Sequence, residues 1–166
     1  MNAPAIAYVG LGGNLGDAAA SLRDAFGALG RLPLSRLLRA SRLYRTPAWG
    51  VTAQPDFINA VAMIETSLAP MRLLEHLLGI ERDAGRERRA DRSDRWGPRT
   101  LDLDLLLYGD QVVDLPGLAV PHPHLHERAF VLVPLLEIAP GIRIPGHGPA
   151  ADALAAVASG DIEALG

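Results

Sequence analysis

The spacing of apolar side chains along the chain predicts an alternation of strands and helices. Short apolar or alternating runs are typical of strands, and they lie at residues 5–9, 34–44, 57–65 and 101–108. Apolar side chains at helical spacing lie at residues 18–29 and 70–84. We therefore predict an α+β fold, a ferredoxin-like α/β sandwich in which helices pack on one face of a mainly antiparallel sheet, with one domain over residues 1–166.

Local features follow from the same pattern. Asp17 is expected to cap the helix that follows it. In the second helix the side chains expected to face inward are Met71, Leu74, Leu77 and Leu78. Glu81 is expected on the outer face of that helix. A turn at residues 109–110 predicts a hairpin with residues 111–113. The apolar stretch at residues 128–136 predicts a helix or turn, and the alanine-rich tail from residue 151 predicts a helix.

Two acidic residues carry the strongest chemical signal. Asp102 and Asp104 alternate with leucines where an arginine-rich loop becomes a strand, so both carboxylates point to one face. Two like charges so close are costly unless a cation lies between them, and magnesium commonly binds one or two carboxylates together with substrate phosphate. Arginines in the preceding loop would then meet phosphate oxygens. The pattern predicts either a phosphoryl-transfer site or a solvated loop whose arginines pair with the two acids.

Composition narrows the range of partners. The net charge of -3 argues against a general nucleic-acid or membrane surface, so phosphate binding must depend on local clusters. The chain contains no cysteine, which excludes disulfides and thiolate chemistry and fits a reducing compartment. All basic residues are arginine, so no lysine-dependent phosphate loop exists. Because neither a signal-peptide pattern nor a long apolar segment is visible, we expect a cytoplasmic protein.

Two further motifs suggest ligands but have simpler interpretations. The glycine-rich stretch at residues 10–16 lacks the spacing of a dinucleotide loop, and its glycines suit a turn from strand to helix. His122, His124 and His126 alternate in a proline-containing segment, which could indicate a metal site. No acidic or cysteine partner follows at a recognised spacing, so structural histidines are the favoured interpretation.

Four motifs together resemble one known family. They are Gly-Gly-Asn-Leu-Gly-Asp at residues 12–17, Arg-Thr-Pro at 45–47, Gln-Pro-Asp-Phe-Ile-Asn at 54–59 and Arg-Trp-Gly-Pro-Arg-Thr-Leu-Asp-Leu-Asp at 95–104. The family is 6-hydroxymethyl-7,8-dihydropterin pyrophosphokinase, and the resemblance covers about residues 6–140. It implies a ferredoxin-like enzyme of folate biosynthesis that moves pyrophosphate from ATP to a pterin alcohol. It also implies a magnesium requirement and small-molecule substrates only, and we expect a monomer.

The resemblance implies roles for particular residues. Asp102 and Asp104 would hold two magnesium ions that bridge the ATP phosphates, and Arg86 and Arg99 would contact the transferring group. The residues implied to contact the pterin are Gly12, Thr46, Pro47, Trp49, Phe57, Asn59 and Phe130. Of these, Phe57 and Phe130 would stack on the ring while Asn59 recognises its edge. The residues implied to lie on the nucleotide side are Glu81, Arg88, Arg95, Trp96, Leu105, His122 and Arg128.

Some positions depart from the family's pattern. Residues 90–95 lengthen the arginine loop, so Arg92 and Arg95 are alternatives for one role. Gly117, Ala119 and Pro123 stand where the best-known members carry an arginine, a threonine and a tyrosine near the nucleotide. The nucleotide contacts there must be weaker or made by other groups. Phe57 replaces a frequent tyrosine, which keeps the stacking surface.

The implied reaction depends on positioning and charge stabilisation. The hydroxymethyl oxygen of the pterin would attack the β-phosphorus of ATP and AMP would leave. No residue is assigned as general base, apart from a contribution of the carboxylates. The loops rich in glycine, arginine and tryptophan are expected to close over the substrates and exclude water. Two alternatives stay open, a non-catalytic pterin- or nucleotide-binding module and an ATP hydrolase that needs no pterin.

Overall fold

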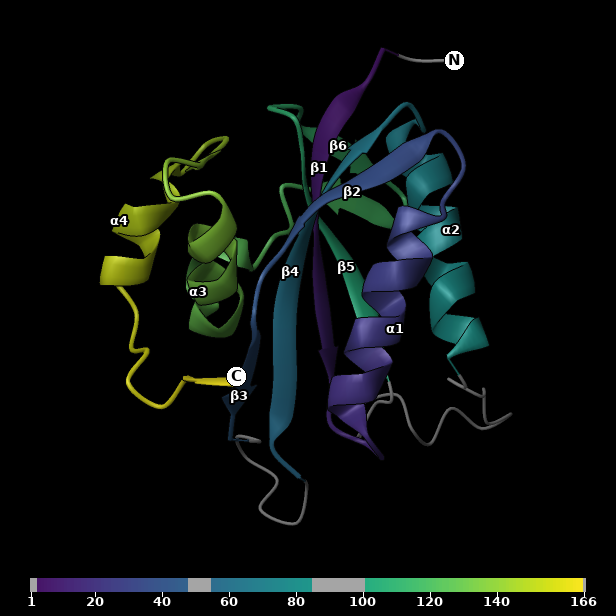
Figure 1. Ribbon diagram of the computed structural model, residues 1–166. Helices are drawn as coiled ribbons and strands as arrows, with labels where there is room; N and C mark the ends of the chain where they lie inside the picture. Colours follow the sequence, from purple (N-terminus) through teal and green to yellow (C-terminus); the bar gives the residue numbers. More distant parts are fainter. Residues whose placement is uncertain (1–2, 48–54, 85–100, 166) are drawn as a thin grey trace.

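An antiparallel sheet forms the centre of the structure, a computed structural model that describes residues 3–47, 55–84 and 101–165 (Figure 1). Its strands are β1 (Ala5–Gly13), β2 (Ser35–Ala40), β3 (Leu43–Thr46), β4 (Phe57–Thr66), β5 (Asp102–Tyr108) and β10 (Glu163–Leu165). They lie in the order β10, β3, β4, β1, β5, and β2 also pairs with β4. Two small hairpins consist of β6 (Val113–Leu115) with β7 (Leu118–Val120), and β8 (Arg143–Ile144) with β9 (Gly148–Pro149).

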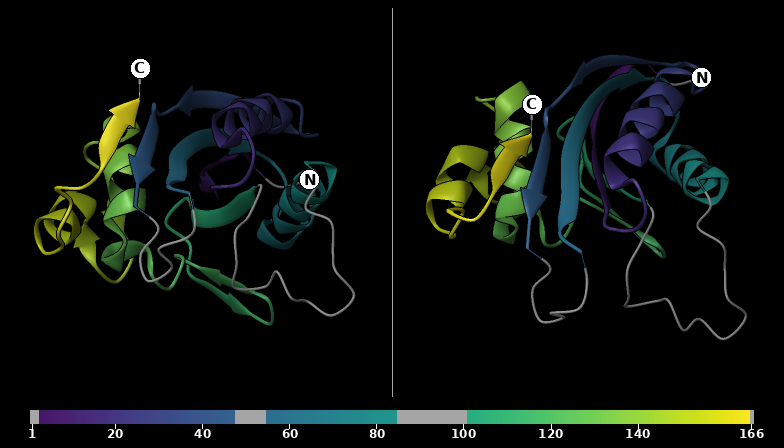
Figure 2. Two further views of the ribbon diagram at one scale, coloured as in Figure 1. Left: turned by 90° about the horizontal axis from the view of Figure 1, so that it is seen from below. Right: turned by 60° about the horizontal axis from the view of Figure 1, so that its bottom comes forward.

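Helices lie on both faces of this sheet (Figures 1 and 2). One face carries α1 (Ala18–Gly30) and α2 (Pro70–Asp83), and the opposite face carries α3 (Ala129–Ile138) and α4 (Ala150–Ala155). A 3-10 turn covers Leu125–Glu127. The predicted ferredoxin-like α+β sandwich is confirmed, but the expectation that its helices lie on one face of the sheet was wrong, because α3 and α4 cover the second face. Within the described ranges, no helix has the length and apolar character required to span a membrane.

Alternate residues of β1, β4 and β5 contribute to two separate apolar cores. Val9 and Ile64 are fully buried beneath α1 and α2, where Leu22 and Leu77 meet them. On the other face, the second core contains the buried strand residues Tyr8 and Val61 together with Leu132 and Leu135 of α3. Because side chains alternate along a strand, neighbouring residues of the same strand, such as Tyr8 and Val9, belong to different cores. The α3 face is filled by apolar side chains toward one end of the strands, and the other end is open for a site.

The segment predicted as one strand at residues 34–44 is divided into β2 and β3. Ser41 lies at the break and is buried, and its hydroxyl accepts a hydrogen bond from the Val61 N–H (2.9 Å) and donates to the Arg42 carbonyl (2.7 Å). The backbone N–H of Ser41 donates in turn to the Val61 carbonyl (2.9 Å). A serine side chain thus replaces part of the strand ladder, which allows the chain to bend while both halves stay paired with β4.

The inward face of α2 differs from the prediction. Its buried residues are Leu73, Leu77 and Glu81, whereas Met71 and Leu78 are 38% and 44% exposed. The expectation that Glu81 faces outward was therefore wrong. Leucines occur on both the buried and the exposed face of α2, so their spacing does not show which face is buried. The contact of Glu81 with Leu103 on β5 identifies the buried face.

The glycine-rich stretch and the later hairpin also differ from expectation. Gly10, Gly12 and Gly13 continue β1 rather than forming the turn, which begins at Gly16 with a φ of +59°. Asp17 caps α1 as predicted, accepting from the Ala20 N–H at 3.1 Å. The predicted hairpin at residues 109–113 was wrong, since β6 instead pairs with β7. In the tail the helix ends at Ala155, and the last residues add β10 beside β3.

Candidate active site

A row of four paired residues crosses the sheet on the α3 face. Asp102 on β5 lies opposite Gly12 on β1, Gly12 lies opposite Asn59 on β4, and Asn59 lies opposite Tyr44 on β3. Directly paired residues of antiparallel strands project to the same side of the sheet. The glycine between Asp102 and Asn59 leaves an open floor, with a carboxylate on one side and an amide on the other.

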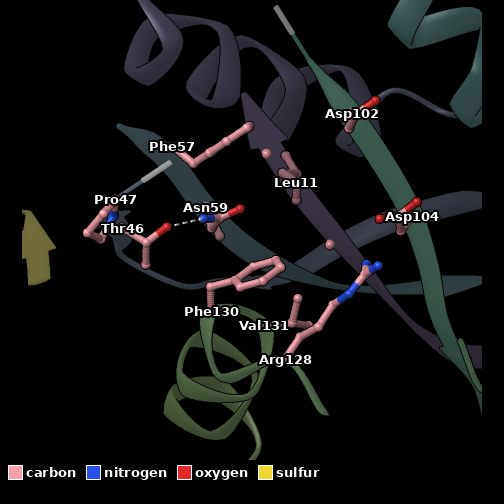
Figure 3. A pocket seen from close by; sticks show the side chains of 13 residues that line it. Leu11, Thr46, Pro47, Phe57, Asn59, Asp102, Asp104, Arg128, Phe130 and Val131 are labelled. Atoms are coloured by element: carbon pink, nitrogen blue, oxygen red, sulfur yellow. Dashed lines mark hydrogen bonds between the residues drawn. The ribbon is translucent and has the colours of Figure 1, made fainter. Parts of the chain in front are cut away.

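This open floor is the base of a cavity of about 460 Å³. Gly10, Leu11, Gly12 and Ala60 line its floor, and the start of α3 contributes Phe130 and Val131 as one wall. Figure 3 shows side chains from β3, β4, β5 and α3 directed toward the same space. A cavity of this size matches small-molecule sites in general.

One end of the cavity combines a buried amide with two aromatic side chains. Asn59 and Thr46 are 7% and 6% exposed, and the Asn59 amide donates to the Thr46 hydroxyl at 3.2 Å. The rings of Phe57 and Phe130 lie on either side of Asn59 (Figure 3). Aromatic faces beside a fixed amide provide stacking together with directed hydrogen bonds, which suits a heterocycle.

The other end is acidic, and Arg128 is the cation that lines it among the residues that the structure describes. Asp102 is half-buried and Asp104 is exposed, and both line the cavity. The Arg128 side chain extends from the residue before α3 toward β5, and its guanidinium carbon lies 5.8 Å from the centroid of the Phe130 ring (Figure 3). Two carboxylates on one strand face are hard oxygen donors, and magnesium needs only one or two from the protein when phosphates supply the rest. The residues present therefore fit a magnesium-phosphate group.

Among the described residues, the histidines near this end make hydrogen bonds and ring contacts with their neighbours. Within residues 3–47, 55–84 and 101–165, no three His, Cys, Asp or Glu side chains are arranged to hold a metal ion. His122 Nδ1 accepts from the His124 backbone, and His126 stacks on His147 with ring centroids 3.9 Å apart. Burial lowers the pKa of His122, Asp104 partly offsets this, and Arg128 and His124 lower it further. His122 therefore belongs to the electrostatic surroundings of the acidic end.

The side chains of Glu81 on α2 and Leu105 on β5 lie on the α2 face of the sheet and are absent from the lining of the cavity. Glu81 is 5% exposed, and its carboxylate accepts from the Leu103 backbone N–H at 2.7 Å. Leu103 lies between Asp102 and Asp104, so Glu81 holds the strand segment that carries both acids. The Leu105 side chain is buried in the core under α2, so a contact of Leu105 with a nucleotide would have to use its backbone.

Truncating Glu81 is expected to destabilise this strand. Glu81→Ala leaves the buried Leu103 N–H without its acceptor, which should cost about 1–3 kcal/mol of unfolding free energy. Glu81→Gln keeps an oxygen at that place and should cost less. Urea unfolding followed by circular dichroism measures both variants. Equal midpoints for Glu81→Ala and the wild type would contradict the assignment of this hydrogen bond.

Several residues proposed from the sequence lie outside the described ranges. They are Trp49, Arg86, Arg88, Arg95, Trp96 and Arg99. The arginine loop and the tryptophan-bearing loop therefore remain predictions. Conversely, the cavity includes Gly10, Leu11, Ala60 and Val131, which sequence reasoning missed. Gly10 could have been found from the strand register, because it lies opposite Asp104.

The fold and cavity fit a class of protein in which a flat heterocycle would lie beside an acidic end suited to magnesium and phosphate. Comparison with known proteins agrees with this class. Residues 8–140 match the family model described as 7,8-dihydro-6-hydroxymethylpterin-pyrophosphokinase (HPPK). The chain belongs to this HPPK family.

Individual relatives are similar over most of their length. A 2-amino-4-hydroxy-6-hydroxymethyldihydropteridine pyrophosphokinase from Pseudomonas aeruginosa is 47% identical over 158 residues, 95% of each chain. The protein of the same name from Haemophilus influenzae is 44% identical and covers 84% of each chain. A Plasmodium falciparum HPPK-DHPS structure with pteroate matches at a TM-score of 0.72 and 13% identity, over 94% of this chain and 43% of that one. At that identity it supports the fold alone, and this chain spans less than half of that protein.

Proposed function

We propose that this chain transfers pyrophosphate from ATP to 6-hydroxymethyl-7,8-dihydropterin, giving AMP and the pterin diphosphate for folate biosynthesis. The observation that carries the proposal is that one cavity joins the Asn59 end and the Asp102 end across a glycine floor. A binding module for a pterin alone would have no use for the paired carboxylates. Family membership and the pyrophosphokinase names of its relatives support the same activity.

The pterin ring would occupy the space beside Phe57 and Phe130. The Thr46 hydroxyl holds the Asn59 amide in one orientation, so its polar groups meet the ring edge without reorganisation. The ring's hydroxymethyl group would then point along the glycine floor toward β5. This placement brings the attacking oxygen to the acidic end, where proximity is the main contribution of the protein.

The phosphates of ATP would lie at the acidic end. Asp102 and Asp104 would hold two magnesium ions, which would neutralise phosphate charge and assist ionisation of the attacking hydroxyl. In the transfer, a bond forms between the pterin oxygen and the β-phosphorus, and the bond from that phosphorus to the α-phosphate oxygen breaks to release AMP. Arg128 would bind phosphate oxygens from the α3 side. Arg86 and Arg99 are proposed for the transferring group.

Gly117, Ala119 and Pro123, the three positions that depart from the family's pattern, still leave the acidic end of the cavity in place. Gly117 turns the β6–β7 hairpin with a φ of +84°, a conformation that favours glycine over an arginine. Ala119 lies on β7 and Pro123 follows it closely. We propose that Arg88, Arg95, Trp96 and the backbone of Leu105 make the nucleotide contacts together with His122. Glu81 would act on that side through β5, and Trp49 and Pro47 would complete the pterin end.

We further propose that the protein works as a single-domain monomer in the cytoplasm, with no nucleic-acid or membrane partner. The cysteine-free composition fits a reducing compartment. The modest net charge of -3 fits small-molecule substrates rather than a polyanionic partner.

The test is AMP release from ATP and magnesium, with and without the pterin alcohol. We expect AMP only when both substrates and magnesium are present, and none after addition of excess chelator. AMP or phosphate release without pterin would indicate an ATP hydrolase. Pterin binding without any AMP would indicate a binding module, and either result would refute the proposal.

A further inference from the structure

Glu137 near the end of α3 makes a cluster of contacts with the β2–β3 segment. Its carboxylate accepts from the Tyr44 hydroxyl at 2.5 Å and from the Arg42 backbone N–H at 3.1 and 3.2 Å. The Arg42 guanidinium approaches the same carboxylate at 3.5 Å. Close by, Arg39 donates to the Ile138 carbonyl at 3.1 Å, so a second contact ties this helix end to the sheet.

These contacts join α3 and β3, two of the elements that form the pterin end of the cavity. Phe130 precedes Glu137 by seven residues on α3, so both project to one side of the helix. Tyr44 precedes Thr46 by two residues on β3 and therefore shares its face, and Tyr44 is paired with Asn59. Figure 2 shows α3 alongside β3 in both views. The distance between helix and strand at Glu137 therefore affects the space between Phe130 and the Thr46–Asn59 pair.

We propose that Glu137 is a positioning residue that, through Tyr44 and the Arg42 backbone, sets the width of the pterin end of the cavity. Its effect is on affinity for the flat heterocyclic substrate, and the proposal rests on the proposed function for the identity of that substrate. Glu137 itself is absent from the cavity lining, so it acts through α3 and β3 without touching the ring.

Burial distinguishes this cluster from the surface ion pairs of the molecule. Tyr44 is 4% exposed, and the Glu137 side chain is 26% exposed. In the Arg36–Glu65 pair the side chains are 70% and 35% exposed, and such pairs contribute little. Burial, together with the neighbouring carboxylate of Glu137, raises the pKa of Tyr44 above its usual value. The tyrosine therefore remains a hydrogen-bond donor throughout the neutral range.

The test compares Tyr44→Phe, Glu137→Ala, Glu137→Gln and the double variant Tyr44→Phe/Glu137→Ala. Binding of 6-hydroxymethyl-7,8-dihydropterin is measured by calorimetry, and KM for each substrate by AMP release. We expect Tyr44→Phe and Glu137→Ala each to weaken pterin binding about five- to tenfold, with the KM for ATP within about twofold of wild type. Glu137→Gln keeps the acceptor oxygen and should restore most of the affinity. The double variant should bind pterin no worse than Glu137→Ala alone, because Glu137→Ala already removes the contact with the Tyr44 hydroxyl.

Glu65→Gln is the matched control, since it removes a carboxylate from an exposed pair at the other end of β4 and should leave pterin binding unchanged. Pterin affinity within twofold of wild type in both Tyr44→Phe and Glu137→Ala would overturn the proposal. So would equal losses for pterin and ATP with a lowered melting temperature, because that pattern indicates general destabilisation. If Glu137→Ala does not fold, Tyr44→Phe decides alone, since it removes a single oxygen. A wild-type protein that binds pterin but releases no AMP would refute the proposed function and leave this binding test intact.

Discussion

Replacing Asp102 by asparagine is expected to reduce pyrophosphoryl transfer at least about 1,000-fold while the protein stays folded. The variant keeps the size of the side chain and removes the charge that faces the cavity opposite Gly12. Charge stabilisation by a bound cation is worth several kcal/mol in the transition state, and each 1.36 kcal/mol corresponds to about tenfold in rate. Because Asn59 and Phe130 lie at the other end of the cavity, pterin binding without ATP should change by less than about twofold.

Single-turnover AMP formation at saturating substrates measures this loss, and calorimetry measures pterin binding on the same sample. Asp110→Asn provides the matched control, because Asp110 is an exposed carboxylate just beyond the end of β5. Asp102→Ala should behave as Asp102→Asn does. Near-normal turnover in either Asp102 variant would show that the assignment of the acidic end is wrong.

Much of the fold could be predicted because its signals are local. Phe57, Asn59 and Val61 alternate along β4, which places them on one face whatever lies around them. The same alternation places Asp102 and Asp104 together on β5. These patterns need no knowledge of neighbouring strands, and they account for the central strands of the sheet and for the amide and the carboxylates at the two ends of the cavity.

The remaining features depend on contacts between residues far apart in the chain. Glu81 lies 22 positions from Leu103, and Tyr44 lies 93 positions from Glu137. A buried carboxylate with a backbone partner has the same sequence signature as an exposed one, so Glu81 was expected on the wrong face. The bend at Ser41 likewise depends on Val61, whose backbone meets the serine hydroxyl. Such features follow from register, which the order of residues alone does not reveal.

Gly12→Ala is expected to weaken pterin binding about 30-fold or more. A β-carbon at this position would lie 2.9 Å from the Asn59 side-chain oxygen, closer than non-bonded atoms tolerate, whereas the next neighbour, the Ile58 carbonyl, is 3.8 Å away. Gly12 has no left-handed backbone angle, so the strain comes from this contact alone. The amide must move away from Thr46, and loss of one directed, buried hydrogen-bonding group costs about 2 kcal/mol, or roughly 30-fold in affinity. Calorimetry with the pterin alcohol measures the change.

A double-variant cycle separates this cause from a general disturbance of β1. Asn59→Ala removes the oxygen that the new methyl group would meet, so Gly12→Ala/Asn59→Ala should bind pterin no worse than Asn59→Ala alone. Gly30→Ala is the control. Gly30 is the last residue of α1, and a β-carbon there would make an ordinary 3.6 Å contact with Leu37. Additive losses in the double variant would mean that Gly12 acts independently of Asn59. In that case the role of Gly12 would be to keep the floor between the two ends of the cavity open, and the orientation of the Asn59 amide would not depend on it.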